Sequence, residues 1–460
     1  MVKVITYGTF DLFHEGHYRL LKRAKALGDY LIVGVTTESF DKARGKLNVI
    51  DSLMTRIENV KKTGFADEII IEETVGQKFS DIKKYHIDIF TVGSDWEGQF
   101  DYLKDHCKVV YLERTKNISS TMLRAKKRRI QRIGVIGTGR IAGRFMSEAR
   151  SVSGVEVQSV YNPHPVSALK FAEQWDLDAY RDIEDFYSNV DAVYIASPHE
   201  THYGYIKTAL EHGKNVICEK PMVLKKSEAE EVYSYAKAHG LILYEGIKTA
   251  YCPGFHKLLG VAFSGRIGAV RNIEACFTKL ENPQTRELTD TRYGGSFLEL
   301  GSYVLLPVMK IFGTDYARVN FEVIHGENGL DLFTKANLRY PNGIATVTVG
   351  LGVKAEGRLL ISGTKGYIVV GAPWWKTSYF EVHYEDPNKV EKYTEPFLDF
   401  GLRYEISDFL SKLSANGEED FKLTREESIA MAGIMEKFMD EERKEDGTDE
   451  KDTSLGTQGC

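Results

Sequence analysis

The chain has 460 residues and a formal net charge of −6, from 60 basic and 66 acidic side chains. This length indicates two or three domains, and the charge balance excludes a chain-wide basic surface of the nucleic-acid-binding kind. The apolar content of 42% is typical of a globular protein. The five cysteines have no paired spacing, so we expect reduced thiols and no zinc site. Neither a signal peptide nor a long apolar run is present, so we expect a cytoplasmic protein without a membrane span.

Strand-like and helix-like runs alternate from residue 1 to 126, which predicts an α/β domain with a doubly wound parallel sheet. The expected strands are 3–7, 30–37, 68–73, 87–93 and 109–114, and the expected helices are 18–28, 51–64 and 78–87. A basic stretch follows, of which 127–132 is the expected linker to the next domain. The alternative is that its positive charge supports a nucleotide's phosphates.

Two histidines, His14 and His17, stand where the first strand gives way to the first helix, in YGTFDLFHEGHYRLL. The unpaired N–H groups and the positive dipole of a helix start attract phosphate. Two imidazoles there could stabilise the charge that forms when a phosphoryl bond breaks, and Gly16 leaves room for the ligand. A purely structural role is the alternative, while a metal site lacks an evident third ligand. The pattern predicts phosphate chemistry.

A second strand–helix alternation runs over 133–248 and begins with GVIGTGRIA, which predicts a dinucleotide-binding Rossmann domain. Gly137 would allow the tight turn, Gly139 the approach of a pyrophosphate, and Ala142 close helix packing. No acidic residue ends the second strand, where Asn162 and His164 stand instead. The choice between NAD and NADP therefore stays open.

From 249 to 440 the pattern changes to long β-rich stretches with turn signals at 341–343 (PNG) and 363–366 (GTKG). These features predict an α+β domain with a large, mostly antiparallel sheet that has one open face. Residues 441–460 are polar and charged, and we expect a disordered tail there.

The N-terminal domain resembles the glycerol-3-phosphate cytidylyltransferase family over nearly all of residues 1–125. The resemblance rests on YGTFDLFHEGH and on VGSDWEGQFDYLKDHCKVVYLERTKNISST, whose end is similar to the family's RTEGISTT. H-x-G-H alone is shared with adenylyltransferases and indicates only nucleotidyl transfer. Lys116 and Asn117 replace the family's Glu-Gly, which leaves the choice of acceptor open.

This resemblance implies a role for each matching residue. His14 and His17 would contact the phosphates of CTP and stabilise the pentacovalent α-phosphorus, and a magnesium ion is expected with the triphosphate. Lys46 and Arg114 would be catalytic cations that grip phosphates. The expected nucleotide-binding residues are Thr9, Phe10, Asp11, Asp95, Ser119 and Thr121.

Residues 131–440 resemble the glucose–fructose oxidoreductase and inositol dehydrogenase family, through ASPHETHYGYIKTALEHGKNV, VICEKPMVL and YGGSFLELGSYVLLPV. The resemblance implies that Lys220 lies beside the nicotinamide and that Glu299, where Asp is commoner, and Tyr303 complete the catalytic set. We expect Tyr303 to protonate a ketone while Lys220 lowers its pKa. The expected cofactor-binding residues are Gly137, Gly139, Arg140, Ile141, Asn162, Ser197, Pro198, His199, His202 and Glu219. For His199 and His202, packing of polar loops is an equal alternative.

Together the resemblances imply a bifunctional enzyme. It would reduce a ketose phosphate with NADH or NADPH and transfer CMP from CTP to the product, giving pyrophosphate and a CDP-polyol of the CDP-ribitol or CDP-glycerol type. Such products feed teichoic-acid and capsule synthesis, which implies a bacterial source. The alternatives are an oxidoreductase that acts on the CDP-linked product, and a nucleotide sensor with one inactive half. We expect no nucleic-acid partner and a homodimer or homotetramer.

Overall fold

The computed structural model describes residues 1–37, 40–41, 49, 51–74, 76–113, 131–414 and 422–445. The chain divides into two compact units. The first comprises Met1–Gln131 and Ala149–Glu156, and the second comprises Arg132–Glu148 and Val157–Cys460.

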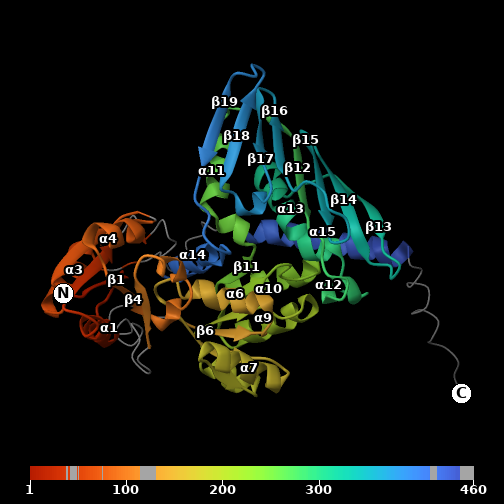
Figure 1. The fold of residues 1–460 in the computed structure, drawn as a ribbon. Coiled ribbons are helices and arrows are strands. Elements are labelled where there is room, and N and C mark those ends of the chain that lie inside the picture. The colour runs from red at the N-terminus through yellow and green to blue at the C-terminus, as the bar shows by residue number, and fades with distance from the viewer. Residues whose placement is uncertain are drawn as a thin grey trace, which may run out of the picture. The chain divides into compact units, whose positions relative to one another are not determined.

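A five-stranded sheet with the order β3-β2-β1-β4-β5 forms the first unit, and its pairs are parallel (Figure 1). The strands are β1 (Lys3–Gly8), β2 (Tyr30–Thr36), β3 (Glu68–Glu72), β4 (Ile89–Gly93) and β5 (Lys108–Leu112). The helices are α1 (Glu15–Lys25), α3 (Leu53–Lys62) and α4 (Gln77–Tyr85), with short 3-10 turns η1 (Ser94–Trp96) and η2 (Asp101–Leu103). The expected doubly wound parallel sheet is confirmed.

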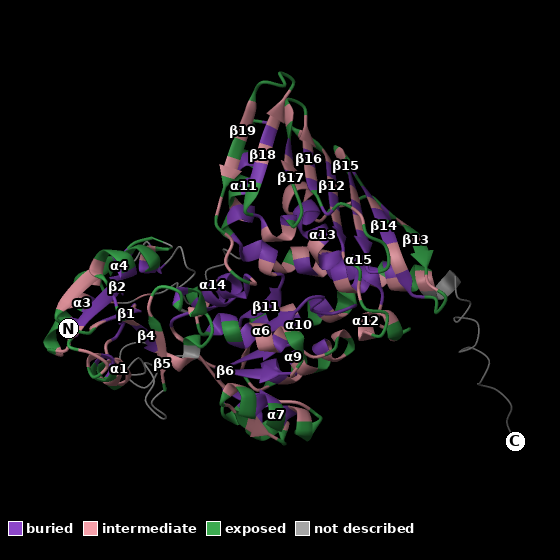
Figure 2. Cartoon of the chain, viewed as in Figure 1, coloured by how far each residue is buried: buried purple, intermediate pink, exposed green. Residues whose placement is uncertain are grey.

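Alternate residues of β1 and β2 face two separate cores, as strand geometry requires. Val4 and Leu31 belong to the core beneath α1 and α3, and Ile5 and Ile32 belong to the core beneath α4. Figure 2 shows both strands as buried. Because both faces are covered, ligands reach this sheet only at its edges and strand ends.

The second unit begins with a parallel six-stranded sheet of order β11-β10-β9-β6-β7-β8. Its strands are β6 (Gln131–Ile136), β7 (Val155–Tyr161), β8 (Asp178–Tyr180), β9 (Ala192–Ile195), β10 (Asn215–Glu219) and β11 (Leu243–Gly246). Its helices are α6 (Arg140–Ala149), α7 (Pro165–Trp175), α8 (Ile183–Ser188), α9 (His202–Glu211) and α10 (Lys226–Ala238), with η3 (His199–Thr201) before α9. The strand order reverses at β6, which places a ligand crevice at the carboxyl ends of β6 and its neighbours.

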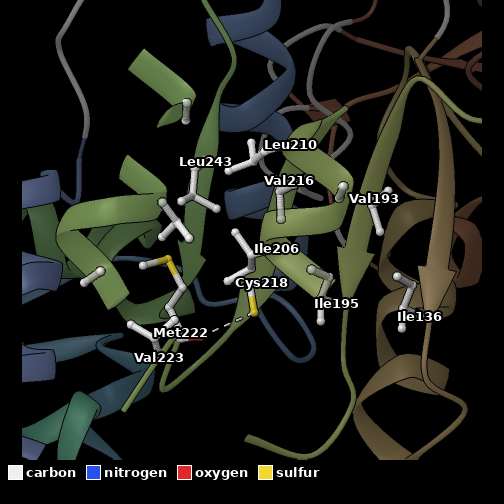
Figure 3. Close-up of a cluster of buried hydrophobic side chains, with 14 of the residues drawn as sticks. Ile136, Val193, Ile195, Ile206, Leu210, Val216, Cys218, Met222, Val223 and Leu243 are labelled. Atoms are coloured by element: carbon white, nitrogen blue, oxygen red, sulfur yellow. Dashed lines mark hydrogen bonds between the residues drawn. The ribbon is translucent and has the colours of Figure 1, made fainter. Parts of the chain in front are cut away.

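An apolar core supports this sheet from one side (Figure 3). Ile206 and Leu210 of α9 pack with Ile195 of β9 and with Val216 of β10, and all four are at most 1% exposed. Cys218 takes part as a small apolar side chain. The core holds the end of β10 in place, and the chain continues from that end into Lys220.

The remainder of the second unit contains an eight-stranded sheet of order β13-β14-β15-β12-β16-β17-β18-β19. Its strands, a broad fan in Figure 1, are β12 (Val270–Thr278), β13 (Arg318–His325), β14 (Asp331–Tyr340), β15 (Gly343–Gly350), β16 (Leu359–Gly363), β17 (Gly366–Val370), β18 (Tyr379–Tyr384) and β19 (Val390–Thr394). β12 pairs with β15 in parallel and the other pairs are antiparallel, so the expected mostly antiparallel sheet is confirmed.

The helical segments of this part are η4 (Lys248–Tyr251), α11 (Pro253–Phe263), α12 (Arg286–Thr289), α13 (Ser296–Phe312), η5 (Trp374–Lys376), α14 (Leu402–Ser414) and α15 (Arg425–Glu445). Helix α13 packs on β12, β14 and β15, and α15 packs on α13. α15 continues to Glu445, past residue 441, where the polar tail was expected to begin. Within the described ranges, no helix is long and apolar enough to cross a membrane.

Candidate active sites

The two histidines of the first unit lie together at the start of α1. His14 is the N-cap residue, and its Nδ1 accepts the N–H of Gly16 at 2.9 Å. The rings of His14 and His17 stack with centroids 3.9 Å apart. Phe10 packs edge-on against His17 at 5.4 Å, which restricts the orientation of that imidazole. Both histidines thus stand at the helix N-terminus that the sequence predicts for them.

Thr9 and Asp11 shape the loop between β1 and α1. The hydroxyl group of Thr9 donates a hydrogen bond to Asp41 Oδ1 at 3.0 Å. Asp11 Oδ1 accepts the N–H of Asp51 at 2.9 Å. Thr9 is 4% and Asp11 1% exposed, so both act as framework for the phosphate site rather than as open surface groups.

Arg56 of α3 is a buried cation that the sequence analysis missed. Its Nη1 donates to the carbonyl oxygens of Thr9 at 2.9 Å and Thr36 at 2.8 Å, and lies 3.5 Å from Asp41 Oδ2. It therefore ties together the chain segments at the carboxyl ends of β1 and β2. An arginine in an amphipathic helix pattern is usually a surface residue, and nothing in the spacing distinguishes this one.

Lys78 of α4 is a second buried cation of this unit. It forms an ion pair with Glu72 at the end of β3, and its Nζ lies 4.6 Å from the ring centre of Tyr7. Tyr7 donates its hydroxyl to Asp81 Oδ2 at 2.8 Å. Burial, followed by the charge of Asp81, raises the pKa of Tyr7, which stays protonated. The charge of Lys78 is thus offset within the cluster by the carboxylate of Glu72.

Four expected site residues, Lys46, Arg114, Ser119 and Thr121, lie outside the described residues, as does the side chain of Asp95. Their roles remain predictions. Among the residues that the structure describes, no group of three or more His, Cys, Asp or Glu side chains could hold a metal ion.

The turn after β6 has the geometry of a dinucleotide-binding loop. Gly137 has φ = 103°, and a Cβ there would lie 2.5 Å from the carbonyl oxygen of Ala196. A Cβ on Gly139 would meet nothing within 4 Å, so this glycine faces open space at the start of α6. A pyrophosphate fits there, because the backbone can be approached and the helix dipole is positive.

The neighbouring residues complete this loop. Arg140, whose side chain is 59% exposed, lies 3.7 Å from Glu287, and Ile141 is half-buried. Asn162 follows β7 and donates to Thr138 Oγ1 at 2.8 Å. The N–H of His164 donates to Asn162 Oδ1 at 2.8 Å. These amide and imidazole groups occupy the place where a carboxylate would hold the ribose of NAD.

Four predicted residues of the oxidoreductase meet beyond the end of β10. Lys220 Nζ donates to the carbonyl oxygen of Glu299 at 2.9 Å and lies 3.3 Å from its Oε1. His199 Nε2 lies 3.6 Å from Glu299 Oε2. Lys220 Nζ is 5.7 Å from the ring centre of Tyr303, one helical turn after Glu299 on α13. The structure thus brings two distant motifs into one site.

The expectation that Lys220 lowers the pKa of Tyr303 is wrong. Burial, followed by the negative charges of Glu219 and Glu405, raises the Tyr303 pKa well above its usual value. Burial, with the charge of Lys220 next, lowers the pKa of His199 well below its usual value. At neutral pH the phenol is therefore protonated and the imidazole neutral, so Tyr303 is the better proton donor.

His202 is fully buried, and both of its ring nitrogens contact the backbone. Nδ1 lies 2.9 Å from the carbonyl oxygen of Pro221, and Nε2 lies 2.9 Å from that of Ser197. The packing alternative therefore describes His202, which joins the two loops that lead into the site. Ser197 Oγ also accepts the hydroxyl of Thr201 at 2.7 Å, and Pro198 precedes η3.

Glu219 is fixed by a hydrogen bond from a buried side chain of the second unit. Tyr194 donates its hydroxyl to Glu219 Oε1 at 2.5 Å and stacks on Phe145 of α6 with ring centres 3.7 Å apart. Burial raises the pKa of Glu219, and the charge of Lys220 opposes that shift. Glu219 is therefore fixed in place directly before Lys220, and its 6% exposure leaves little surface for direct cofactor contact.

A cavity of about 240 Å³ adjoins His199 on the second unit. It is lined by His199, Glu200, Tyr203, Val223, Leu224, Lys225, Glu228, Arg292, Tyr293, Glu436, Met439 and Asp440. The lining combines carboxylates and cations with apolar side chains such as Val223, Leu224 and Met439.

Comparison with known families assigns both units. Residues 5–126 match the cytidylyltransferase-like family, 131–247 the oxidoreductase family with an NAD-binding Rossmann fold, and 256–369 the GFO/IDH/MocA C-terminal domain. The N-terminal domain is 50% identical over 124 residues to a glycerol-3-phosphate cytidylyltransferase of Bacillus spizizenii, which covers 27% of this chain and 95% of that protein.

The chain is a cytidylyltransferase fused to a GFO/IDH/MocA-family oxidoreductase. Its oxidoreductase part is 28% identical over 317 residues to a scyllo-inositol 2-dehydrogenase (NADP(+)) of Bacillus subtilis, covering 66% of this chain and 95% of the relative. Among solved structures, it shares its fold with a 3-ketoreductase from Actinomadura kijaniata in complex with NADP and TDP-benzene, with a TM-score of 0.58, 23% identity, and coverage of 66% of this chain and 95% of that one. A UDP-N-acetylglucosamine 3-dehydrogenase from Acidithiobacillus ferrooxidans has a TM-score of 0.57 at 20% identity, covering 68% of this chain and 96% of that one.

Proposed function

We propose that this fusion makes a CDP-polyol in two steps. The oxidoreductase reduces a ketose phosphate to a polyol phosphate, and the cytidylyltransferase then transfers CMP from CTP to that product and releases pyrophosphate. The observation that carries the proposal is the 50% identity of the first domain to a glycerol-3-phosphate cytidylyltransferase. An enzyme of that kind needs a polyol phosphate, and the fused reductase supplies one. A product of this type would feed teichoic-acid or capsule synthesis.

In the transferase, His14 and His17 hold the triphosphate at the start of α1. A phosphate oxygen of the polyol phosphate attacks the α-phosphorus of CTP, and the bond to the β-phosphate oxygen breaks. The stacked imidazoles stabilise the charge on the equatorial oxygens, and Lys46 and Arg114 add positive charge. Such transfer depends on positioning and charge neutralisation. We assign magnesium to the triphosphate itself, since this ion is commonly bound through substrate phosphates.

In the reductase, the loop of Gly137, Gly139 and Arg140 holds the cofactor's pyrophosphate. A reduced nicotinamide bound there would supply a hydride to the carbonyl carbon of the ketose and would itself be oxidised. Tyr303 donates its proton to the carbonyl oxygen, and Lys220, fixed by Glu299, orients the reacting groups. Asn162 and His164 stand where a ribose-binding carboxylate would, and this favours NADPH over NADH.

Reduction comes first in this proposal. A ketone replaces a hydroxyl donor with a planar acceptor, and a site built to bind the hydroxyl rejects such an analogue strongly. The alternative is that the reductase acts on a CDP-linked ketose. The fold's likeness to a 3-ketoreductase solved with TDP-benzene favours that alternative.

The test supplies the full-length protein with CTP and one ketose phosphate, then adds NADPH or NADH. Dihydroxyacetone phosphate, ribulose 5-phosphate and a ketohexose phosphate form the substrate panel. Pyrophosphate that appears only after the reductant supports the proposal. A CDP-ketose that accumulates beforehand overturns the order. A chain that binds CTP but releases no pyrophosphate with any polyol phosphate would be a sensor.

A further inference from the structure

Lys248, the first residue of η4, is a half-buried cation that the reaction scheme above does not use. In the part of the chain that the structure describes, its ammonium group forms no ion pair and no hydrogen bond. Burial, followed by the charge of Lys376, lowers the pKa of Lys248. A charge taken out of water without a partner is unfavourable, so this position calls for an anion that the polypeptide does not provide.

Lys376 of η5 is the second cation at the same place. Thr249 donates its hydroxyl to the carbonyl oxygen of Trp375 at 2.8 Å, which joins η4 to η5 and brings the two adjacent lysines together. Lys376 Nζ donates to the carbonyl oxygen of Asp399 at 3.3 Å, and across the described ranges it has no carboxylate at ion-pair distance. Two like charges repel each other, and an anion between them removes that repulsion.

A wall of three contacting aromatic side chains runs from these lysines to the proton donor, Tyr303. Trp375 stacks on Phe277 with ring centres 3.5 Å apart, and Phe277 meets the edge of Tyr303 at 5.4 Å. The wall therefore begins at the residue next to Lys376 and ends at Tyr303. The lysine pair is thus joined to Tyr303 through the ring contacts of Trp375 and Phe277.

The two interior carboxylates, Glu219 and Glu405, do not neutralise the charge of Lys248. Glu405 is fully buried, and burial followed by the charge of Glu219 raises its pKa well above the usual value. Its negative charge acts to raise the pKa of Lys248, but within the described ranges the two side chains form no ion pair. Glu219 already has the hydroxyl of Tyr194 at 2.5 Å and the neighbouring charge of Lys220. The charge of Lys248 thus remains available to a ligand.

We propose that Lys248, assisted by Lys376, determines the substrate specificity of the oxidoreductase by holding a phosphate ester of the substrate while the carbonyl faces Tyr303. This inference rests on the proposed function and narrows its substrate class to phosphorylated ketoses. The same phosphate chemistry occurs in a free ketose phosphate and in the diphosphate of a CDP-linked ketose, and the experiment separates the two.

The experiment compares Lys248→Met with the wild type as full-length proteins. KM and kcat are measured for a ketose phosphate, for the same ketose without its phosphate, and for its CDP-linked form, and NADPH affinity is measured by fluorescence. We expect KM for the ketose phosphate to rise about ten- to hundredfold, as for loss of a charged hydrogen bond. KM for the unphosphorylated ketose and the affinity for NADPH should be unchanged. Lys248→Arg should keep much of the wild-type KM, and Lys376→Met should show a smaller rise.

Lys392→Met is the matched control, because Lys392 is 66% exposed on β19. It should match the wild type with every substrate. An equal loss with phosphorylated and unphosphorylated ketoses would overturn the inference and give Lys248 a structural role. Weaker NADPH binding would overturn it in favour of the cofactor's pyrophosphate. An effect confined to the CDP-linked ketose would support the phosphate contact and identify the diphosphate as its source.

Failure of the inference can be told from failure of the proposed function. If the wild type reduces the ketose phosphate and Lys248→Met leaves KM unchanged for both the ketose phosphate and its CDP-linked form, the inference is wrong and the function stands. If the wild type reduces no phosphorylated ketose with either nicotinamide, the proposed function is wrong and the inference falls with it.

Discussion

Lys220 donates a hydrogen bond to the carbonyl oxygen of Glu299 at 2.9 Å and lies 3.3 Å from that residue's carboxylate. The contact joins the end of β10 to the first turn of α13. It links the Rossmann sheet, which would carry the cofactor, to the helix that carries Tyr303. A substitution of either residue should therefore affect both hydride transfer and protonation of the carbonyl oxygen.

Replacing His17 with alanine should reduce CMP transfer about a hundredfold and leave hydride transfer unchanged. The stacked pair at the start of α1 would lose one of its two phosphate contacts in the transition state, and such losses are typically about 10²–10³ in rate. Pyrophosphate release from CTP and glycerol 3-phosphate measures the first activity, and NADPH oxidation measures the second.

His106→Ala is the control for this substitution. His106 is exposed in the same unit and packs edge-on to Phe79 at 4.7 Å, away from α1. It should retain normal pyrophosphate release. Normal release by His17→Ala would instead show that the nucleotide site is wrongly assigned.

Replacing Tyr303 with phenylalanine should remove most reductase activity, by about 10²–10⁴-fold, because general acid catalysis contributes that much. Affinity for NADPH and transfer of CMP to a supplied polyol phosphate should persist. Stopped-flow NADPH oxidation is the measurement. Tyr367→Phe, at a residue 40% exposed on β17, should match the wild type. A loss below threefold for Tyr303→Phe would mean that another group gives the proton.

The motifs predicted the fold and the gathering of Lys220, Glu299 and Tyr303 because each is local. A strand followed by a glycine turn or by Lys-Pro indicates a strand end, and parallel strand ends share one edge of a sheet. The same reasoning placed His14 and His17 at a helix start. These predictions needed only the order of elements and a known topology.

The remaining features depend on long-range packing, which no single motif records. Arg56 is buried by carbonyls from two strand ends, and Lys248 meets Lys376 only through the Thr249–Trp375 hydrogen bond. The pKa of Tyr303 follows from its burial near Glu405, a residue more than 100 positions away in the chain. Glu219 and Lys220 were visible in the sequence, whereas the position of Glu405 near Tyr303 was not.

Asp331 of β14 anchors the start of α13, and its replacement by alanine should destabilise the protein. Its Oδ2 accepts the N–H of Phe297 at 2.8 Å and the hydroxyl of Thr334 at 2.7 Å, and the residue is 3% exposed. Loss of the carboxylate removes a cap and leaves buried donors unpaired, which costs about 2 kcal/mol. Urea unfolding should show the loss, together with lower reductase activity, because α13 carries Glu299 and Tyr303. Unchanged unfolding would contradict the anchoring role.

Asp331→Asn should show the pH dependence of this anchor. Burial raises the Asp331 pKa to about 7, above the roughly 3.9 of an unfolded chain. The folded state therefore holds an extra proton between these values, and the stability from this group is greatest at low pH and falls as the pH rises through about 7. An asparagine does not titrate. The difference in Tm, variant minus wild type, should become more positive between pH 5 and pH 8 and then level off. A difference that stays constant across this range, or becomes more negative, would show that the carboxyl is already ionised in the folded protein at pH 5.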